Sequence, residues 1–131
     1  MPLRPSPFDR VRYEDHVSPI VRAISIRQPW VELILRGEKT EEYRSRATTL
    51  RERVYVYASA TPADSPPAWR ALEVAPGDLP TGKILGTVEI VGCYWNARKN
   101  TFAYVLQSPR RLRSPLAPRN QPQPVFWRPV F

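Results

Sequence analysis

The stretch GKILGTVEIVGCYW, at residues 82–95, limits what this chain can fold into more than any other part of the sequence. Along it, apolar residues and glycines recur at every second position, which is the period of a β-strand. The residues that share one face are Ile84, Gly86, Val88, Ile90 and Gly92. Glycines on the inner face of a long strand are typical of a sharp bend, so the stretch predicts a curved strand in a small barrel.

Shorter segments complete a mostly β outline of the α+β class. Strands are predicted at VRAISI (residues 21–26), EEYRSR (41–46), RVYVYASA (53–60), TFAYVLQSPRRL (101–112) and PVFWRPVF (124–131), the last at an edge. The strand that begins at residue 101 is expected to end at Pro109, because proline interrupts a hydrogen-bonded ladder. A helix of about two turns is predicted at QPWVELILRG, since Pro29 suits the first position of a helix and Gly37 a left-handed C-terminal cap.

The chain divides into an irregular N-terminal arm at residues 1–20 and one barrel domain at residues 21–131. The arm is rich in proline and has no sustained period of either kind. A long excursion at residues 61–80 contains a helical turn around PAWRALEV. No run reaches the roughly 18 apolar residues of a membrane span, and no signal peptide is visible. We therefore expect a cytoplasmic, monomeric protein with no membrane partner.

The charges are distributed unevenly along the chain. The net charge is +8, and all 12 acidic residues lie at or before Glu89, so residues 90–131 carry basic residues only. Such an asymmetry indicates a polyanionic partner. Only three of the 20 basic residues are lysines, and the planar fork of arginine suits phosphate. An ordinary solvated basic surface is the alternative interpretation.

The sequence offers little for metal or redox chemistry. Cys93 is the single cysteine and His16 the single histidine, which excludes an internal disulfide and a cysteine-based zinc cluster. No phosphate-binding loop or dinucleotide-binding pattern is present. We therefore expect no metal and no cofactor.

The segment GEKTEEYRSR, at residues 37–46, places a dense group of charges directly after the apolar helix. If EEYR is a strand, Glu42 and Arg44 project from the same face, and Lys39 lies in the turn before them. Together they offer donors for phosphate or carbonyl oxygens and an acceptor for a base amino group. The alternative is a surface charge network that contributes little to stability.

The order of these segments resembles that of the ASCH (activating-signal-cointegrator homology) family of PUA-like β-barrels. The segments that carry the resemblance are SIRQPWVELILRGEKTEEYR, RVYVYAS, GKILGTVEIVGC, TFAYVLQSPRRL and FWRP, which together cover about residues 22–128. The G-x-K-x-x-E-x-R signature of that family is filled by Gly37, Lys39, Glu42 and Arg44. The resemblance implies a closed barrel with an early helix beside a cleft, a cleft lined by the signature, and RNA or nucleotide ligands.

Two groups of binding residues are expected. The residues that line the cleft are Gln28, Trp30, Lys39, Glu42, Arg44, Tyr57 and Ser59. The residues that hold an RNA backbone are Arg98 and Lys99, which follow the aromatic pair Tyr94 and Trp95, and Arg110, Arg111 and Arg113, in a loop after Pro109. Trp30 also suits a core position, and both basic groups also suit ordinary exposed turns.

The function predicted from these features is binding of RNA or a nucleotide, with two alternatives. A hydrolase acting on RNA or a modified nucleoside would use Lys39 and Glu42 as catalytic residues. One branch of the family that the chain resembles hydrolyses N4-acetylcytidine with a lysine, a threonine and a glutamate. Here Glu42 stands where that threonine belongs, and no acidic residue follows Glu89. The other alternative is a protein-interaction module.

Overall fold

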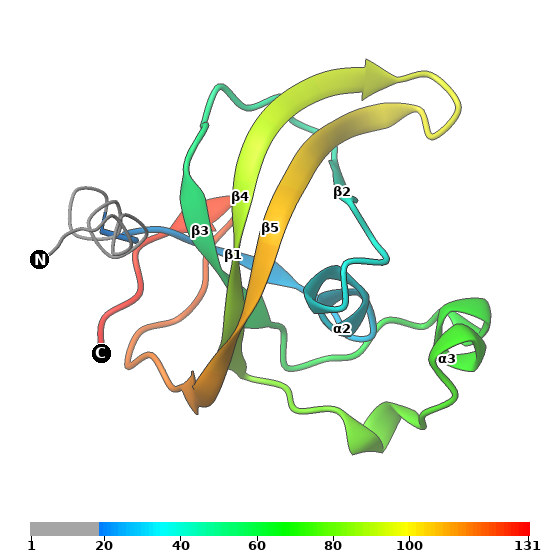
Figure 1. The fold of residues 1–131 in the computed structure, drawn as a ribbon, viewed down its shortest axis with the longest axis vertical. Helices are drawn as coiled ribbons and strands as arrows, with labels where there is room; N and C mark the ends of the chain where they lie inside the picture. The colour runs from blue at the N-terminus through cyan, green and yellow to red at the C-terminus, as the bar shows by residue number, and fades with distance from the viewer. Residues whose placement is uncertain (1–18) are drawn as a thin grey trace, which may run out of the picture.

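A strongly curved six-stranded sheet dominates the computed structural model, which describes residues 19–131 (Figure 1). The strands in chain order are β1 (Ala23–Ile26), β2 (Glu41–Arg44), β3 (Arg53–Ala58), β4 (Lys83–Asn96), β5 (Thr101–Leu116) and β6 (Phe126–Trp127). Across the sheet the order is β2-β5-β4-β3-β1-β6, in which β1 and β3 are parallel and the other neighbours antiparallel. The mostly β class predicted from the sequence is confirmed, with β6 at an edge as expected.

Two short α-helices and one 3-10 turn complete the described chain: α2 (Trp30–Leu35), α3 (Pro66–Leu72) and η1 (Pro76–Asp78). Gly37 has a φ of +81°, a left-handed conformation that favours glycine, and it follows α2 as predicted. The N–H groups of Glu38 and Lys39 both donate to the carbonyl oxygen of Leu33. The chain therefore turns directly after α2, so that Lys39 lies in the turn and Glu42 and Arg44 lie on β2.

The hydrophobic core lies on one face of the sheet, which we call the inner face. Along β3, buried residues such as Val54 and Val56 alternate with partly exposed ones, so successive side chains point to opposite faces. β4 contributes Val88 and Ile90 to the same cluster, and α2 contributes Ile34. Burial of this apolar face fixes the register of the strands and therefore which side chains remain on the outer face.

Gly86 allows α2 to approach β4 closely. A Cβ atom at this position would lie 2.5 Å from the backbone oxygen of Arg110 and 2.5 Å from Cδ2 of Leu35. The pairing of β4 with β5 shifts register next to Gly86 and again next to Gly92. Both glycines therefore lie at bends of the strand, as predicted. They do not share a face as expected, because the register shift after Ile90 places Gly92 opposite Val105 on the outer face, whereas Gly86 meets Leu35 on the inner face.

The two edges of the curved sheet approach each other without completing a hydrogen-bonded barrel. Among residues 19–131 the strand order begins with β2 and ends with β6, so no ladder joins those two strands. Side chains span the gap instead, because Arg44 of β2 donates to the backbone oxygen of Ser25 in β1. The ring of Tyr104 in β5 also stacks on that of Phe126 in β6, with centroids 5.9 Å apart. The expectation of a closed barrel is replaced by a barrel-like sheet closed by side chains.

β5 does not end at Pro109, as the sequence had indicated, but continues to Leu116. Thr87 faces Arg110 and Glu89 faces Gln107, so two residues of β5 oppose one of β4 at this point. Pro109 therefore sits in a β-bulge, where no ladder hydrogen bond is required of it. The expected loop of Arg110, Arg111 and Arg113 is instead a strand, whose alternation sends neighbouring arginines to opposite faces of the sheet.

Most of the expected N-terminal arm lies outside the described residues, which begin at Pro19. From that residue onward, the structure contains no helix with the length and apolar character needed to cross a membrane. The proline-rich excursion forms α3 and η1, which confirms the helical turn predicted there. Trp69 anchors this excursion, because its indole N–H donates to the carbonyl oxygen of Ala63 at 3.0 Å.

Candidate functional site

The three charged residues of the signature form a continuous chain of ionic contacts, which we call the charge chain: Lys39, Glu42 and Arg44. Glu42 lies in the middle, with its Oε1 atom 3.7 Å from Nζ of Lys39 and its Oε2 atom 3.0 Å from Nε of Arg44. Strand alternation places Glu42 and Arg44 on the same face of β2, as predicted, and this is the inner face, where Glu42 is only 9% exposed. The negative charge of this buried carboxylate is thus flanked by a cation on either side.

Lys39 is largely withdrawn from solvent. Its Nζ atom donates to the backbone oxygen of Glu41 at 2.6 Å, in addition to its contact with Glu42. Burial lowers the pKa of Lys39 below the usual 10.5, and the negative charge of Glu42 acts in the opposite direction. The ammonium group of Lys39 is thus held by two contacts, and the negative charge of Glu42 favours its protonated form.

Arg44 connects the charge chain to a small pocket. The pocket has a volume of about 230 Å³ and is lined by Arg44, Ser25 and residues 122–125. Neither Lys39 nor Glu42 belongs to this lining, so the rest of the charge chain lies behind Arg44. The volume is below the roughly 300 to 1,000 Å³ of most drug-sized ligand sites and suits a single base or a smaller group.

Tyr43 joins the signature to the hairpin formed by β4 and β5. Nζ of Lys39 lies 4.7 Å from the centroid of the Tyr43 ring, and Nζ of Lys99 lies 5.2 Å from it. The phenol groups of Tyr43 and Tyr94 both donate to the carboxylate of Glu41, at 2.9 and 2.6 Å. Two segments that the sequence analysis treated separately therefore form one surface of aromatic and positively charged groups.

Both phenols in this surface are held in their protonated form. Burial, followed by the hydrogen bond to Glu41, raises the pKa of Tyr43. For Tyr94 the hydrogen bond to Glu41 is the main cause of a raised pKa. Both hydroxyl groups therefore remain donors to Glu41 over the whole neutral range.

The tip of the β4–β5 hairpin presents exposed aromatic residues beside basic ones. Tyr94 is 44% exposed and Trp95 is 51% exposed, although the ring of Trp95 keeps an edge contact with Phe102 at a centroid distance of 5.1 Å. Arg98 and Lys99 lie in the turn between the strands, which Figure 1 shows extending beyond the rest of the sheet. The tip of the hairpin therefore exposes both aromatic rings and positive charges to solvent.

The remaining residues expected in the cleft have other surroundings. Gln28 is fully buried, where its side chain donates to the carbonyl oxygen of Pro80 and accepts from the N–H of Glu32. Trp30 packs against the hydrophobic core. Tyr57 lies edge-on to Trp127 at 5.4 Å, and Trp127 reaches the hydroxyl of Ser25, so Tyr57 is connected to Arg44 only indirectly.

For Ser59 the structure gives a backbone role, since its N–H donates to the carbonyl oxygen of Ile26 at 2.9 Å.

Arg111 pairs with the helix and differs in this from its neighbours on β5. Its two terminal nitrogens donate to both oxygens of Glu32, at 3.0 and 2.9 Å. Burial alone would raise the pKa of Glu32, but the hydrogen bonds and charges of Arg111 and Arg36 hold that pKa below the usual 4.5. Arg111 therefore fastens α2 to β5, next to the close contact at Gly86.

Several residues that shape the site were not expected from the sequence. Glu41 and Tyr43 belong to the outer-face surface, and their signal was their position between the signature residues on a strand. The pocket wall at residues 122–125 had no local signal, because only tertiary folding brings it to Arg44. No group of three or more His, Cys, Asp or Glu side chains in residues 19–131 is arranged to hold a metal ion.

Comparison with known proteins identifies the family. The ASCH domain profile matches residues 24–111. The human protein activating signal cointegrator 1 is 33% identical over 81 residues, which cover 53% of this chain but only 14% of that much longer protein. The crystal structure of ASCH from Zymomonas mobilis superimposes with a TM-score of 0.57 at 15% identity, covering 82% of this chain and 85% of that one. A mutant of the same Zymomonas protein gives a TM-score of 0.57 at 14% identity, with 82% and 88% covered. The family profile spans more than half of the sequence, and this chain belongs to the ASCH domain family.

Proposed function

We propose that this chain binds RNA, or a nucleotide-containing ligand, through the signature and the adjoining β4–β5 hairpin. The observation that carries the proposal is the convergence of Lys39 and Lys99 on the ring of Tyr43. This contact joins the signature of a PUA-like family linked to RNA binding to a basic, aromatic surface on the hairpin. A ligand lying across Tyr43 would contact both parts at once.

The hairpin supplies the chemistry needed for a single-stranded backbone and its bases. Tyr94 and Trp95 expose ring faces on which bases can stack, and such stacking contributes about 1 to 3 kcal/mol per base. Arg98 and Lys99 offer positive charge to the phosphates, and no acidic residue occurs in the sequence after Glu89. RNA recognition commonly combines unstacked bases with nearby cations in this way.

The pocket beside Arg44 is the proposed site for one base or nucleotide group. Arg44 offers guanidinium donors at its wall, and the lining also includes the polar residues Ser25 and Gln123. The charge chain holds Arg44 in position, since one of its nitrogens is already bound to Glu42. Substitution of Glu42 would therefore leave Arg44 less well oriented, although Glu42 itself does not line the pocket.

The test compares binding of a fluorescent single-stranded RNA by the wild-type chain and by the double variant Arg98→Gln/Lys99→Gln. If these residues contact phosphates, each lost contact lowers the slope of log K against log salt by about 0.7. The control is Lys83→Gln, which removes an exposed lysine from the other end of β4. Equal affinity and slope for the double variant and the control would remove the hairpin from the proposed surface.

A further inference from the structure

Two tyrosines flank a small residue on the outer face of the sheet, where the β4–β5 hairpin lies beside β2. Ala103 of β5 pairs with Tyr43 of β2 on one side and with Tyr94 of β4 on the other. Directly opposite residues of paired strands project to the same face, so the three side chains form a row across three strands. Ala103 is fully buried within this row. Its small side chain leaves room for both phenol groups to reach one acceptor.

Glu41 is that acceptor, and its two oxygens bind different strands. Oε1 accepts the hydroxyl of Tyr43, two positions further along β2, at 2.9 Å, and Oε2 accepts the hydroxyl of Tyr94 on β4 at 2.6 Å. Hydrogen bonds to a charged acceptor are roughly twice as strong as those between neutral groups. The carboxylate therefore fixes the hydroxyl end of each ring.

The contacts of Glu41 continue into the basic turn and return to Tyr43. Nδ2 of Asn96 donates to the hydroxyl of Tyr94 at 3.3 Å, and Oδ1 of Asn96 accepts the backbone N–H of Lys99 at 3.1 Å. Nζ of Lys99 in turn lies 5.2 Å from the centroid of the Tyr43 ring. These five residues form a closed circuit of contacts, which we call the tyrosine network, and Glu41 is its acidic member.

Attachment of the hairpin to β2 does not by itself explain this acid. Both β2 and β4 are already joined to β5 by backbone ladders along this part of the sheet. A carboxylate beside Lys39 and Lys99 also weakens the attraction of the surface for phosphates. Tyr94 nevertheless stays 44% exposed while its hydroxyl is bound. An aromatic ring held at its polar end and open along its side is preorganised for stacking, because it loses little freedom when a base binds.

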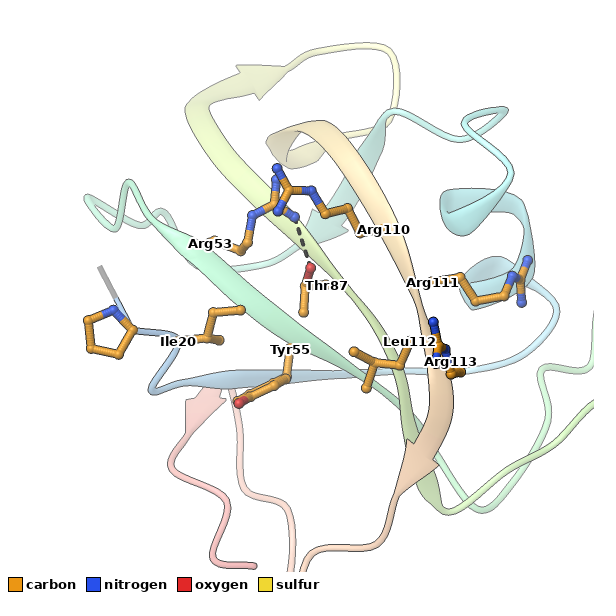
Figure 2. Close-up of a pocket in the computed structure, with 9 residues that line it drawn as sticks. Ile20, Arg53, Tyr55, Thr87, Arg110, Arg111, Leu112 and Arg113 are labelled. Atoms are coloured by element: carbon orange, nitrogen blue, oxygen red, sulfur yellow. Dashed lines mark hydrogen bonds between the residues drawn. The ribbon is translucent and has the colours of Figure 1, made fainter. Parts of the chain in front are cut away.

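The arginine-lined hollow farther along the outer face differs from this surface (Figure 2). Arg53 at one end of it already donates to the hydroxyl of Thr87 at 2.9 Å, and Arg111 donates to Glu32 on α2. Figure 2 shows Arg113 at the opposite end from Arg53. The arginines of the hollow are thus engaged or separated, whereas the hairpin presents an exposed ring next to its cations.

We propose that Glu41 is a positioning residue for RNA binding, a role that rests on the proposed function and makes it more specific. By holding both phenols, Glu41 presents the exposed ring of Tyr94 as a platform for one base of a single-stranded RNA. Through Tyr94 and Asn96 it also holds the turn that carries Lys99 to a neighbouring phosphate. Glu41 acts through these residues and need not touch the RNA.

The first experiment compares the affinity of the wild type and Glu41→Gln for a fluorescent single-stranded RNA. Glutamine has the same size, but only one of its two terminal atoms can accept a hydrogen bond, so one phenol loses its acceptor. Release of one ordered side chain should weaken binding about 2- to 10-fold, whereas removal of a negative charge alone should tighten it. The control is Glu38→Gln, which removes an exposed acid in the turn before β2 and should not weaken binding.

Tyr94→Phe tests the same link with little risk to the fold, because it removes only the hydroxyl and keeps the ring. We expect weaker binding of similar size. In the double variant Glu41→Gln/Tyr94→Phe the loss should be smaller than the product of the two separate losses, since both changes break one shared hydrogen bond. Wild-type affinity of Tyr94→Phe, or fully multiplicative losses in the double variant, would overturn the role of this link.

Fluorescence of a 2-aminopurine base in the RNA, read when all the RNA is bound, separates stacking from stability. A variant that merely lowered the folded fraction would need more protein to reach saturation but would give the wild-type emission there. We expect Glu41→Gln and Tyr94→Phe to shift this emission toward that of free RNA, and Glu38→Gln to match the wild type. Wild-type emission from both of the first two variants would overturn the positioning role.

The same measurements distinguish this inference from the proposed function. If Arg98→Gln/Lys99→Gln weakens RNA binding but Glu41→Gln binds as tightly as Glu38→Gln, the hairpin binds RNA and the positioning role of Glu41 is rejected. If the wild type binds no RNA, the proposed function fails and the positioning role fails with it.

Discussion

Gly86→Ala should destabilise the fold at the point where α2 meets β4. The added Cβ atom would lie 2.5 Å from the backbone oxygen of Arg110, about 1 Å inside ordinary van der Waals contact. It would lie equally close to Cδ2 of Leu35. The Leu35 side chain can move, but the Arg110 carbonyl belongs to a paired strand and cannot move without disturbing β5. Overpacking of this kind costs about 1 to 3 kcal/mol.

Thermal unfolding followed by circular dichroism measures this cost, and for a domain of this size the loss corresponds to a fall in Tm of about 4 to 12 °C. The matched control is Gly92→Ala on the same strand. Its Cβ atom would meet Val105 at 3.4 Å, which is ordinary contact. Replacing a glycine by alanine also reduces the conformational entropy of the unfolded chain, which favours folding by about 0.4 to 1 kcal/mol. Equal stability of the two variants would refute the close approach of α2 to β4.

Two further predictions concern titrating groups. NMR titration should find the pKa of Lys39 below 10.5. Glu42→Gln should lower this pKa further, since the charge of Glu42 is the main influence that opposes the effect of burial. A higher pKa of Lys39 in the variant would contradict the contact between Lys39 and Glu42. Because the folded chain releases this proton first, Lys39 makes stability increase with pH between its folded and unfolded pKa. Arg111→Ala should cost about 1 kcal/mol in urea unfolding at neutral pH, a modest value because Arg111 is 48% exposed. The pKa of Glu32 is lowered on folding, so its contribution is present above about 4.5 and is lost as the pH falls through the folded value. The cost of Arg111→Ala should therefore shrink in acid, and a constant cost would contradict the ion pair.

The sequence predicted those parts of the fold that follow from local periodicity and capping. The alternation in RVYVYA defines β3, and the left-handed Gly37 ends the turn after α2. The glycines at positions 86 and 92 indicated where β4 bends, and the register shifts lie beside them. In each case the residues that determine the structure are close together in the chain.

Features that depend on partners distant in the chain were beyond sequence reasoning. Pro109 was expected to end a strand, because the sequence does not show that the opposing residues of β4 leave room for a bulge. The periodicity near Arg111 cannot reveal that Glu32 is its partner 79 positions away. Glu42 and Arg44 were expected to share a face, but the sequence did not show that Lys39, in the turn before them, also contacts the ring of Tyr43.

The most direct test of RNA binding through the basic surface is the affinity of the wild-type chain for single-stranded RNA over a range of salt concentrations, with the RNA checked for cleavage afterwards. We expect intact RNA and a linear fall of log K with log salt, with a slope of about −0.7 for each phosphate contacted. An affinity that does not change with salt, or no binding at all, would contradict this proposal and favour a protein-interaction module. RNA cleavage that Lys39→Ala abolishes would show instead that the charge chain is catalytic.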